Sequence, residues 1–365
     1  MLNPRPSSAH QWVPCPGSLK LQKKFPELES DRTAAEEGEA SHWYAMYHLK
    51  FNEPPPRNTD ANGTVLTDEM REGAMIYVDA VRAELAGMAD GYAEYEKQMP
   101  ITLLGGIKGT PDSYTFDRTT KTLVIWDYKY GHGVVEVARN WQLFCYASEL
   151  KRILDVKHTE FVIVQPRGFH PDGIIRRWTL TDDVYEEMRH QLTVALDWTR
   201  AENPRTKAGP HCKYCSARHA CTTLQQSASD DPMALIGSSR SNLMDPARLG
   251  AALRILKNID SQVSALKSGL EAQAEQMLKK GAVIPGWCLA PSQGKLVWNV
   301  DAETVEDVGK SMKQDWLKPK AAITPTQAIA AGGQEAHIKA MSTRKNSMVL
   351  KEDDVQNLTN IFPIN

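Results

Sequence analysis

Residues 107–131 alternate apolar with polar positions in the manner of two short strands. A Pro-Asp turn at Asp112 leads into the first strand, residues 117–121 form a polar turn, and the second strand ends near Asp127 and Lys129. Alternate residues of a strand share a face, so Asp127 and Lys129 point the same way from an otherwise apolar strand. The pattern predicts a β-hairpin with a carboxylate and an ammonium side by side at its end.

The segments on either side of this hairpin repeat apolar residues at helical or strand spacings. Two kinds of element are expected: helices at residues 33–49, 68–97 (one or two helices), 135–153 and 182–200, and strands at residues 159–165 and 173–180. Strands interleaved with helices predict an α/β fold, a mixed central sheet flanked by helices.

The chain changes character after residue 225. Residues 226–245 are rich in Ser and Asp and predict a linker between a first domain, residues 1–225, and an extension, residues 246–365. A leucine-rich stripe over residues 246–280 steps by three and four, which predicts one long amphipathic helix. The rest of this mainly helical extension is expected to form a small hairpin at residues 286–289 and 296–298 and short helices at residues 305–316 and 324–331.

The composition is that of an ordinary globular protein, with 41% hydrophobic and 24% charged residues in a chain of 365. A net charge of −2 gives no global attraction to nucleic acid, so DNA contacts would have to rest on local basic clusters. No apolar run is long enough to span a bilayer, and the N-terminus lacks a signal-peptide core. We therefore expect a cytoplasmic protein without membrane contacts, in which the six cysteines are ligands or bystanders rather than disulfides.

Asp112 and Asp127 are the first candidates for chemistry. The hairpin can bring both carboxylates to one edge of the sheet, where buried charges are costly unless they are paired or bind a metal. Hard oxygen ligands favour Mg²⁺ or Mn²⁺, and Lys129 would lie beside the metal, placed to act on a water or on developing phosphate charge. The alternative is an ordinary surface ion pair, with Asp112 only a turn former.

Two neighbouring helices supply further polar candidates. His42 can face inward from the helix at residues 33–49, either as a ligand or as a hydrogen-bonded core histidine. Gln142 and Tyr146 are four residues apart, with Arg139 one turn earlier on the same predicted helix face. That face could contact a phosphodiester or a base, or it could be a half-exposed helix flank.

The cysteines are the second informative set. Cys212, Cys215 and Cys221 form a C-x2-C-x5-C pattern in a loop, which is typical of a metal-binding knuckle. The fourth ligand is open: His211 or His219 would complete a zinc site, whereas Cys15 would complete a four-thiolate set for a [4Fe–4S] cluster. Cys15 lies between two prolines, which hold its backbone extended.

In chain order these residues resemble the nuclease motifs of the PD-(D/E)XK superfamily, specifically its RecB-type branch. The motifs are Gly38-x3-His42, Gly109-Thr110-Pro111-Asp112, Asp127-Tyr128-Lys129 and Gln142-x3-Tyr146. The flanking cysteines resemble the iron–sulfur staple of AddB-type nucleases and of related CRISPR-adaptation nucleases, with one Cys before the core and three after it. The resemblance covers roughly residues 10–225. In size and layout the chain looks like stand-alone RecB-like proteins of phages and prophages.

The resemblance implies a restriction-endonuclease-like core that hydrolyses DNA phosphodiesters with Mg²⁺ or Mn²⁺, often as an exonuclease at DNA ends. It implies His42, Asp112, Asp127 and the Tyr128 carbonyl as metal ligands and Lys129 as the catalytic lysine. Gln142 and Tyr146 would hold the DNA or orient the site. It also favours a [4Fe–4S] cluster over Zn²⁺ at Cys15, Cys212, Cys215 and Cys221.

These implications place the expected role in DNA repair, recombination or phage replication. The substrate would be DNA ends or single strands, and residues 246–365 could guide DNA or bind a partner such as a single-strand-binding or recombination protein. One alternative is a catalytically silent DNA-binding or assembly protein on the same fold. Another is a zinc-knuckle nucleic-acid binder in which the Asp-x-Lys triplet is incidental.

Overall fold

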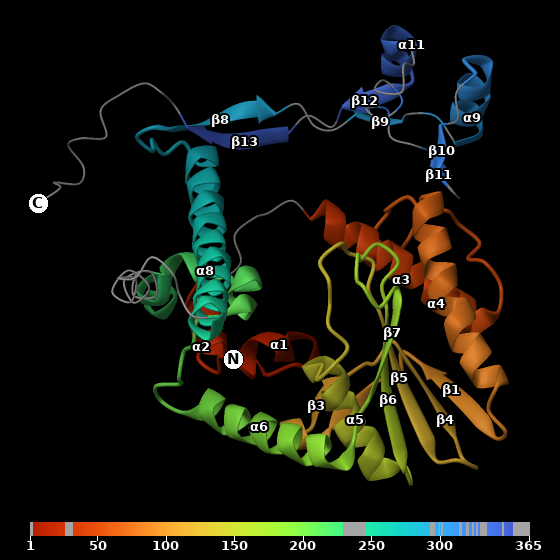
Figure 1. Ribbon diagram of the computed structural model, residues 1–365, viewed down its shortest axis with the longest axis vertical. Helices are drawn as coiled ribbons and strands as arrows, with labels where there is room; N and C mark the ends of the chain where they lie inside the picture. Colours follow the sequence, from red (N-terminus) through yellow and green to blue (C-terminus); the bar gives the residue numbers. More distant parts are fainter. Residues whose placement is uncertain are drawn as a thin grey trace, which may run out of the picture. The chain divides into compact units, whose positions relative to one another are not determined.

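The computed structural model divides the chain into two compact units, Met1–Leu270 and Glu271–Asn365 (Figure 1). The residues that it describes are 3–25, 32–228, 246–292, 296–298, 300, 302–313, 316–318, 321–322, 325, 328, 334–344 and 347–352. The first unit runs past the predicted linker at residues 226–245, most of which lies outside the described residues. That domain boundary stays a prediction.

A five-stranded mixed sheet forms the centre of the first unit, in the order β1-β4-β5-β6-β7. Its strands are β1 (Gly91–Tyr95), β4 (Ser113–Asp117), β5 (Thr122–Tyr128), β6 (His158–Val164) and β7 (Ile175–Thr179). Strands β4 and β5 form the predicted hairpin, β5 and β6 run parallel, and the other neighbours are antiparallel. The predicted hairpin and the two predicted later strands are confirmed.

The two faces of this sheet carry two different apolar cores. Leu123 and Ile125 pack with residues of α5 (Trp141–Ile153) and α6 (Asp182–Arg200), whereas Val124 and Trp126 pack with residues of α3 (Thr33–Phe51) and α4 (Asp68–Ala86). Figure 1 shows the two pairs of helices on opposite sides of the sheet. The alternation along β5 thus sends successive side chains into opposite cores, which confirms the α/β fold of a mixed sheet flanked by helices.

The prediction of helix over residues 68–97 is wrong in its second half. Helix α4 ends at Ala86, and residues 91–95 form the edge strand β1, paired antiparallel with β4. Gly91 suits this position because a Cβ there would lie 2.5 Å from the Cβ of Met88. The aromatic ring of Tyr92 lies 6.0 Å from that of Phe116 in the partner strand, a cross-strand contact that favours the strand over a second helix.

Helix α5 begins at Trp141, six residues later than predicted. The side chain of Asn140 accepts hydrogen bonds from the backbone N–H groups of Gln142 and Leu143, at 3.0 and 3.1 Å, and so caps the helix. Arg139 has a φ of 53°, outside the helical range, and its guanidinium pairs with Glu187. The predicted placement of Arg139 on the helix face of Gln142 is therefore wrong.

Short elements and one long helix complete the first unit. They are η1 (Pro6–Ser8), α1 (Ala9–Trp12), α2 (Ser18–Lys24), η2 (Thr102–Leu104), the paired β2 (Met99–Ile101) and β3 (Ile107–Gly109), η3 (Pro210–Tyr214), η4 (Arg218–Ala220) and α8 (Pro246–Lys279), whose residues after Leu270 belong to the second unit. The bounds of α8 confirm the predicted long amphipathic helix. No described helix has the length and apolar character needed to cross a membrane.

The second unit combines short strands and helices. Strand β8 (Trp287–Ser292) pairs with β13 (Ser347–Glu352), β9 (Leu296–Trp298) with β12 (Ser342–Arg344), and β10 (Leu317–Lys318) with β11 (Ala321–Ala322). Its helices include α9 (Ala302–Ser311) and α11 (Glu335–Ala340). The predicted hairpin of residues 286–298 is wrong because its two strands pair with later segments, β8 about 60 and β9 about 45 residues further along the chain. The helix predicted at residues 324–331 lies mostly outside the described residues.

Candidate active site

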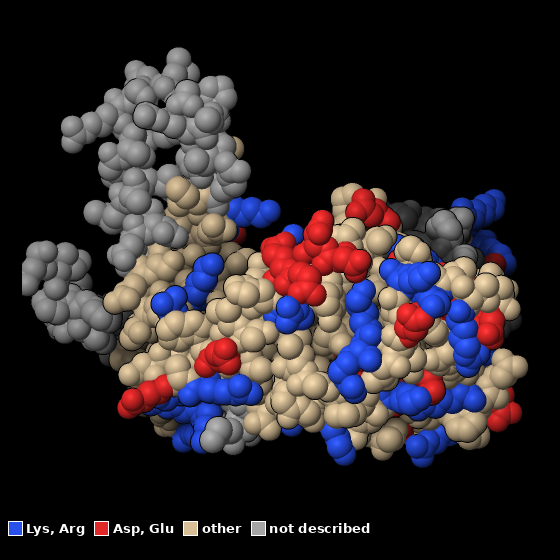
Figure 2. All heavy atoms as spheres, turned by 90° about the horizontal axis from the view of Figure 1, so that it is seen from below, with Lys and Arg blue, Asp and Glu red and all other residues tan. Residues whose placement is uncertain are grey.

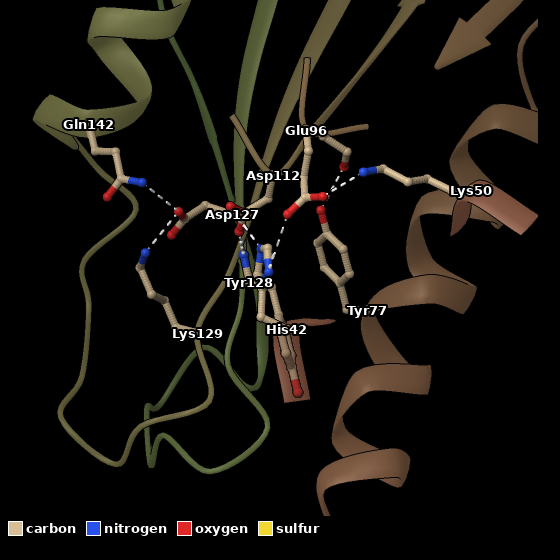
Figure 3. A network of polar contacts seen from close by, with 10 residues as sticks. His42, Lys50, Tyr77, Glu96, Asp112, Asp127, Tyr128, Lys129 and Gln142 are labelled. Atoms are coloured by element: carbon tan, nitrogen blue, oxygen red, sulfur yellow. Dashed lines mark hydrogen bonds and ion pairs between the residues drawn. The ribbon is translucent and has the colours of Figure 1, made fainter. Parts of the chain in front are cut away.

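The carboxyl end of β5 meets the turn before β4, helix α3 and the start of α5 at one edge of the sheet (Figure 3). In the hairpin register Ser113 lies opposite Trp126, so Asp112 and Asp127, one residue further along on each side, face each other. His42 reaches the same point from α3, and Gln142 from α5. The structure thus brings together residues that are up to 100 positions apart.

Asp127 is almost completely buried, with 2% of its surface exposed. Its Oδ1 accepts hydrogen bonds from the Nζ of Lys129 at 2.9 Å and from the Nε2 of Gln142 at 3.0 Å. Burial raises the pKa of Asp127 to about 6; the charge of Asp112 acts in the same direction, and Lys129 offsets part of the effect. No donor among the described residues bonds its Oδ2, so this carboxylate keeps an oxygen for a further ligand.

The surroundings of Asp112 lower its pKa, in contrast to those of Asp127. Its Oδ2 accepts a hydrogen bond of 2.8 Å from the backbone N–H of Tyr128, and its Oδ1 lies 3.1 Å from the Nε2 of His42. Burial acts to raise the pKa of Asp112, but the charges of His42 and Lys129 hold it below its ordinary value. Asp112 is therefore an ionised carboxylate under neutral conditions.

His42 has more acidic neighbours than it has hydrogen bonds. Its Nδ1 lies 3.7 Å from Glu96, yet its buried Nε2 makes no hydrogen bond of good geometry, even to Asp112. Burial acts to lower the pKa of His42, and the charge of Asp112, helped by Glu96 and Asp127, raises it above the ordinary value. A buried imidazole nitrogen without a hydrogen bond, facing a carboxylate, is suited to receive a cation.

Lys129 lies between two hollows in the surface. One, of about 600 Å³, is lined by His42, Asp112 and Lys129 together with one face of α3. The other, of about 740 Å³, is lined by Lys129, Gln142 and parts of the segments around α1 and η3. Burial acts to lower the pKa of Lys129, but Asp127 and Asp112 raise it, so the side chain stays an ammonium. The candidate site is thus open to solvent from two sides.

Tyr146 lies behind the site rather than in the open hollow. It is buried one turn after Gln142, and a Cβ on Gly109 would come within 2.9 Å of its ring. The predicted role of Tyr146 in orienting the site fits this position, whereas direct contact with DNA does not. The Tyr128 side chain points to the opposite face, where its hydroxyl lies 2.8 Å from that of Ser41. The role of the Tyr128 carbonyl as a ligand stays a prediction.

Two residues near the site were not among those predicted from the sequence. The carboxylate of Glu96 lies between His42 and the ammonium of Lys50, which is 2.6 Å away (Figure 3). The hydroxyl of Tyr77 lies 2.6 Å from that of Ser113, next to Asp112 in the chain. Glu96 was placed in a helix by the pattern, so its approach to His42 had no signal in the sequence.

The donor set fits a hard divalent cation, although it is not preassembled. In the described part of the chain, no three His, Cys, Asp or Glu side chains already hold the geometry of a metal site. The chemistry of the donors is nevertheless suitable. His42 and Asp112 line one hollow, and Asp127 lies within electrostatic reach of both. The buried Nε2 of His42 has no hydrogen bond, and the hydrogen bonds to Asp127 from Lys129 and Gln142 both go to its Oδ1. A cation there would relieve the repulsion between Asp112 and Asp127.

The four cysteines predicted as ligands surround one small cavity. Cys15 lies just before α2, Cys212 and Cys215 lie in and just after η3, and Cys221 follows η4. The Sγ of Cys15 accepts a hydrogen bond of 3.4 Å from the backbone N–H of Lys207. Burial, followed by the proximity of the other thiols, raises the pKa of Cys212, and the same causes raise that of Cys215 to about 11.

The two histidines considered as alternative ligands have different surroundings. His211 borders this cavity, with its Nε2 2.8 Å from the carbonyl oxygen of Lys207. His219 instead packs its ring edge-on against Phe25, with the ring centroids 5.6 Å apart. Cys15 and the three later cysteines thus border one cavity together with His211, and the identity of the fourth ligand stays a prediction.

Comparisons with known proteins add a family and a distant structural likeness. A family described as "Protein of unknown function (DUF2800)" matches residues 5–359. A crystal structure described as that of a "Putative exonuclease" from Eubacterium rectale is 13% identical, covers 60% of this chain and 89% of that chain, and has a TM-score of 0.34. That likeness is too distant to carry an argument about function.

Proposed function

The chain belongs to the DUF2800 family, and we propose that it is a DNA nuclease that hydrolyses phosphodiester bonds with Mg²⁺ or Mn²⁺. The observation that carries the proposal is the pairing of the buried Asp127 with Asp112, whose side chain is 15% exposed, and with Lys129 at an open hollow. Burial raises the pKa of Asp127, the charge of Asp112 adds to this effect, and a structural ion pair would not need that second carboxylate. The resemblance to RecB-type motifs supports the same reading.

Each residue has a part in the proposed reaction. His42, Asp112 and Asp127 would hold the metal ion, which when bound lowers the pKa of a water and neutralises charge on the scissile phosphate. Lys129 keeps its proton through its contact with Asp127 and can donate it, or a hydrogen bond, to the charge that develops on the phosphate. Gln142 fixes the orientation of Asp127 through Oδ1.

The charge distribution suits a local rather than a broad DNA contact. On the face shown in Figure 2, Lys and Arg side chains lie among Asp and Glu side chains. With a net charge of −2, binding must rest on the site and its immediate walls. For this reason we propose DNA ends or single strands as the substrates, and therefore exonucleolytic action. The proposed role is in DNA repair, recombination or phage replication, within the cytoplasm.

At the cysteines we propose a [4Fe–4S] cluster, with Zn²⁺ as the alternative. Such a group would require the thiolate forms, which burial disfavours in its absence. It would tie residues near Cys15 to those near Cys212 and so close a loop that contains the whole central sheet.

The test is a nuclease assay on end-labelled linear and closed circular DNA with Mg²⁺ or Mn²⁺, using protein purified without oxygen. We expect degradation of linear DNA, sparing of circles, and at least a hundredfold loss in Asp127→Asn. Asp155→Asn is the matched control, since that carboxylate also pairs with a lysine, Lys121, but is 77% exposed and remote from the hollow. Equal activity in Asp127→Asn and wild type, or none in wild type that binds Mn²⁺, would contradict the proposal.

A further inference from the structure

One wall of the 600 Å³ hollow is a row of three aromatic rings on α3, formed by Trp43, Tyr47 and Phe51. Residues four apart lie on one helix face, and here the rings are in contact along it. The ring centroids of Trp43 and Tyr47 are 6.1 Å apart, and those of Tyr47 and Phe51 are 4.6 Å apart. We call these three residues the aromatic row.

The residues of the aromatic row are only partly buried, unlike the residues of the apolar core. Trp43 packs partly against the core between α3, α4 and the sheet, Tyr47 is half-buried, and Phe51 is 59% exposed. Three adjoining rings that face an open hollow lose the stabilisation that burial would give them. Such a surface indicates a ligand that covers it.

The position of the aromatic row relative to the metal ligands limits what that ligand can be. His42 immediately precedes Trp43, so the row begins beside the candidate site and leads away from it along the same hollow. Cations accompany it: the guanidinium of Arg57 lies 5.8 Å from the Trp43 ring, and Lys50 lies between Tyr47 and Phe51 on the helix. The nearby Glu96 is paired with Lys50 at 2.6 Å, which reduces its repulsion of an anion.

We propose that the aromatic row binds the unpaired bases of a single DNA strand and leads that strand to Asp112, Asp127 and Lys129. This deepens the proposed nuclease function, on which it rests, by naming the form of the substrate. Bases stack on aromatic side chains whatever their sequence, and the phosphates between them would be met by Arg57 and Lys50. In a duplex the faces of the bases are already stacked, so a duplex end would have to open before it could enter.

The dimensions agree with a short single-stranded footprint. Trp43 and Phe51 are eight positions apart, which is about 12 Å along a helix. At a spacing of about 3.4 Å per nucleotide, the aromatic row would hold about three nucleotides. The hollow of about 600 Å³ is in the range of a pocket for one small ligand, which suits one strand rather than two.

The test measures binding without hydrolysis, by fluorescence anisotropy in EDTA with a labelled 12-nucleotide oligothymidine and a blunt hairpin duplex. We expect the single strand to bind at least tenfold more tightly. Tyr47→Leu and Phe51→Leu, which keep an apolar side chain but remove the ring, should each weaken that binding about tenfold and leave duplex binding unchanged. Phe51→Trp should retain it. Phe169→Leu is the matched control, because Phe169 is 94% exposed but lies outside the hollow.

The outcomes separate this inference from the nuclease proposal. Wild-type affinity for the single strand in both leucine variants would overturn the role of the aromatic row, as would equal losses for single strand and duplex. If DNA is cleaved in an Asp127-dependent way while the leucine variants bind normally, the nuclease stands and the aromatic row serves another occupant. If the ring-dependent affinity is found but no DNA is cleaved, the strand-binding site stands and the nuclease fails.

Discussion

Replacing Lys129 by Met separates a catalytic lysine from a structural one. The change removes the ammonium 2.9 Å from Asp127 while keeping most of the apolar chain. Breaking a buried ion pair from one side costs about 3–5 kcal/mol, but Lys129 is 32% exposed and Gln142 still bonds the same oxygen. We therefore expect a loss of about 2 kcal/mol in the metal-free protein, a fall in Tm of about 4–8 °C.

The same substitution, Lys129→Met, should increase the affinity for Mn²⁺ although it lowers the stability of the metal-free protein. A cation that enters the site has to share Asp127 with the ammonium of Lys129, so Lys129→Met should bind Mn²⁺ at least tenfold more tightly, in a calorimetric titration, than wild type. Saturating Mn²⁺, at about 100 times its Kd, adds about 2.7 kcal/mol and should restore the lost stability. Nuclease activity should nevertheless fall at least a hundredfold, because the group that meets the developing phosphate charge is gone.

The matched control is Lys151→Met, in the last turn of α5. Lys151 is also largely buried, with 16% of its side chain exposed, and it pairs with Asp182 at 3.2 Å. It should change neither Mn²⁺ affinity nor activity. The reasoning about Lys129 is refuted if Lys129→Met keeps its activity, or if it loses activity and binds Mn²⁺ more weakly than wild type, because the lysine would then only assemble the site.

Two further predictions concern pH and the cysteines. Because burial raises the pKa of Asp127 to about 6, activity at limiting Mn²⁺ should be lost as the pH falls through about 6. More Mn²⁺ should move that midpoint to lower pH, since metal and proton compete for one carboxylate, and a midpoint independent of Mn²⁺ would contradict this ligand assignment. Cys15→Ser should reduce bound iron or zinc and lower the Tm, whereas Cys288→Ser should change neither; full metal content in Cys15→Ser would remove Cys15 from the ligand set.

The central hairpin was predictable because its signals are local. Three local features identify it: the alternation along residues 122–128, the polar turn before them, and the spacing of Asp127 and Lys129. Each of these features depends only on residues that are close together in the chain. Antiparallel pairing across a short turn then fixes Asp112 opposite Asp127. The pairing of the two carboxylates follows from the same pattern that predicts the strands.

Most of the wrong predictions concern segments whose conformation depends on pairing with residues far away in the chain. Residues 91–95 are too few for periodicity to separate strand from helix, and their conformation is set by pairing with β4, about 20 residues away. The start of α5 depends on the side chain of Asn140, which caps the helix and leaves Arg139 with a positive φ. In the second unit, the partner of β8 is β13, about 60 residues along, and no turn signal marks such a pairing.

The cysteine cavity and the candidate active site share a wall, although each was inferred separately. Gln11 and His211 border both the cavity around the cysteines and the 740 Å³ hollow, which is lined by Lys129 but by none of the aromatic row. The segment around Cys15 is also hydrogen-bonded to the segment that precedes Cys212: the N–H of Gly17 donates to the carbonyl oxygen of Arg205 at 2.7 Å. A metal group bound by Cys15 and the later cysteines would therefore fix the wall of that hollow, so its loss should first affect substrate binding on the Lys129 side and leave the carboxylates of the central sheet in place.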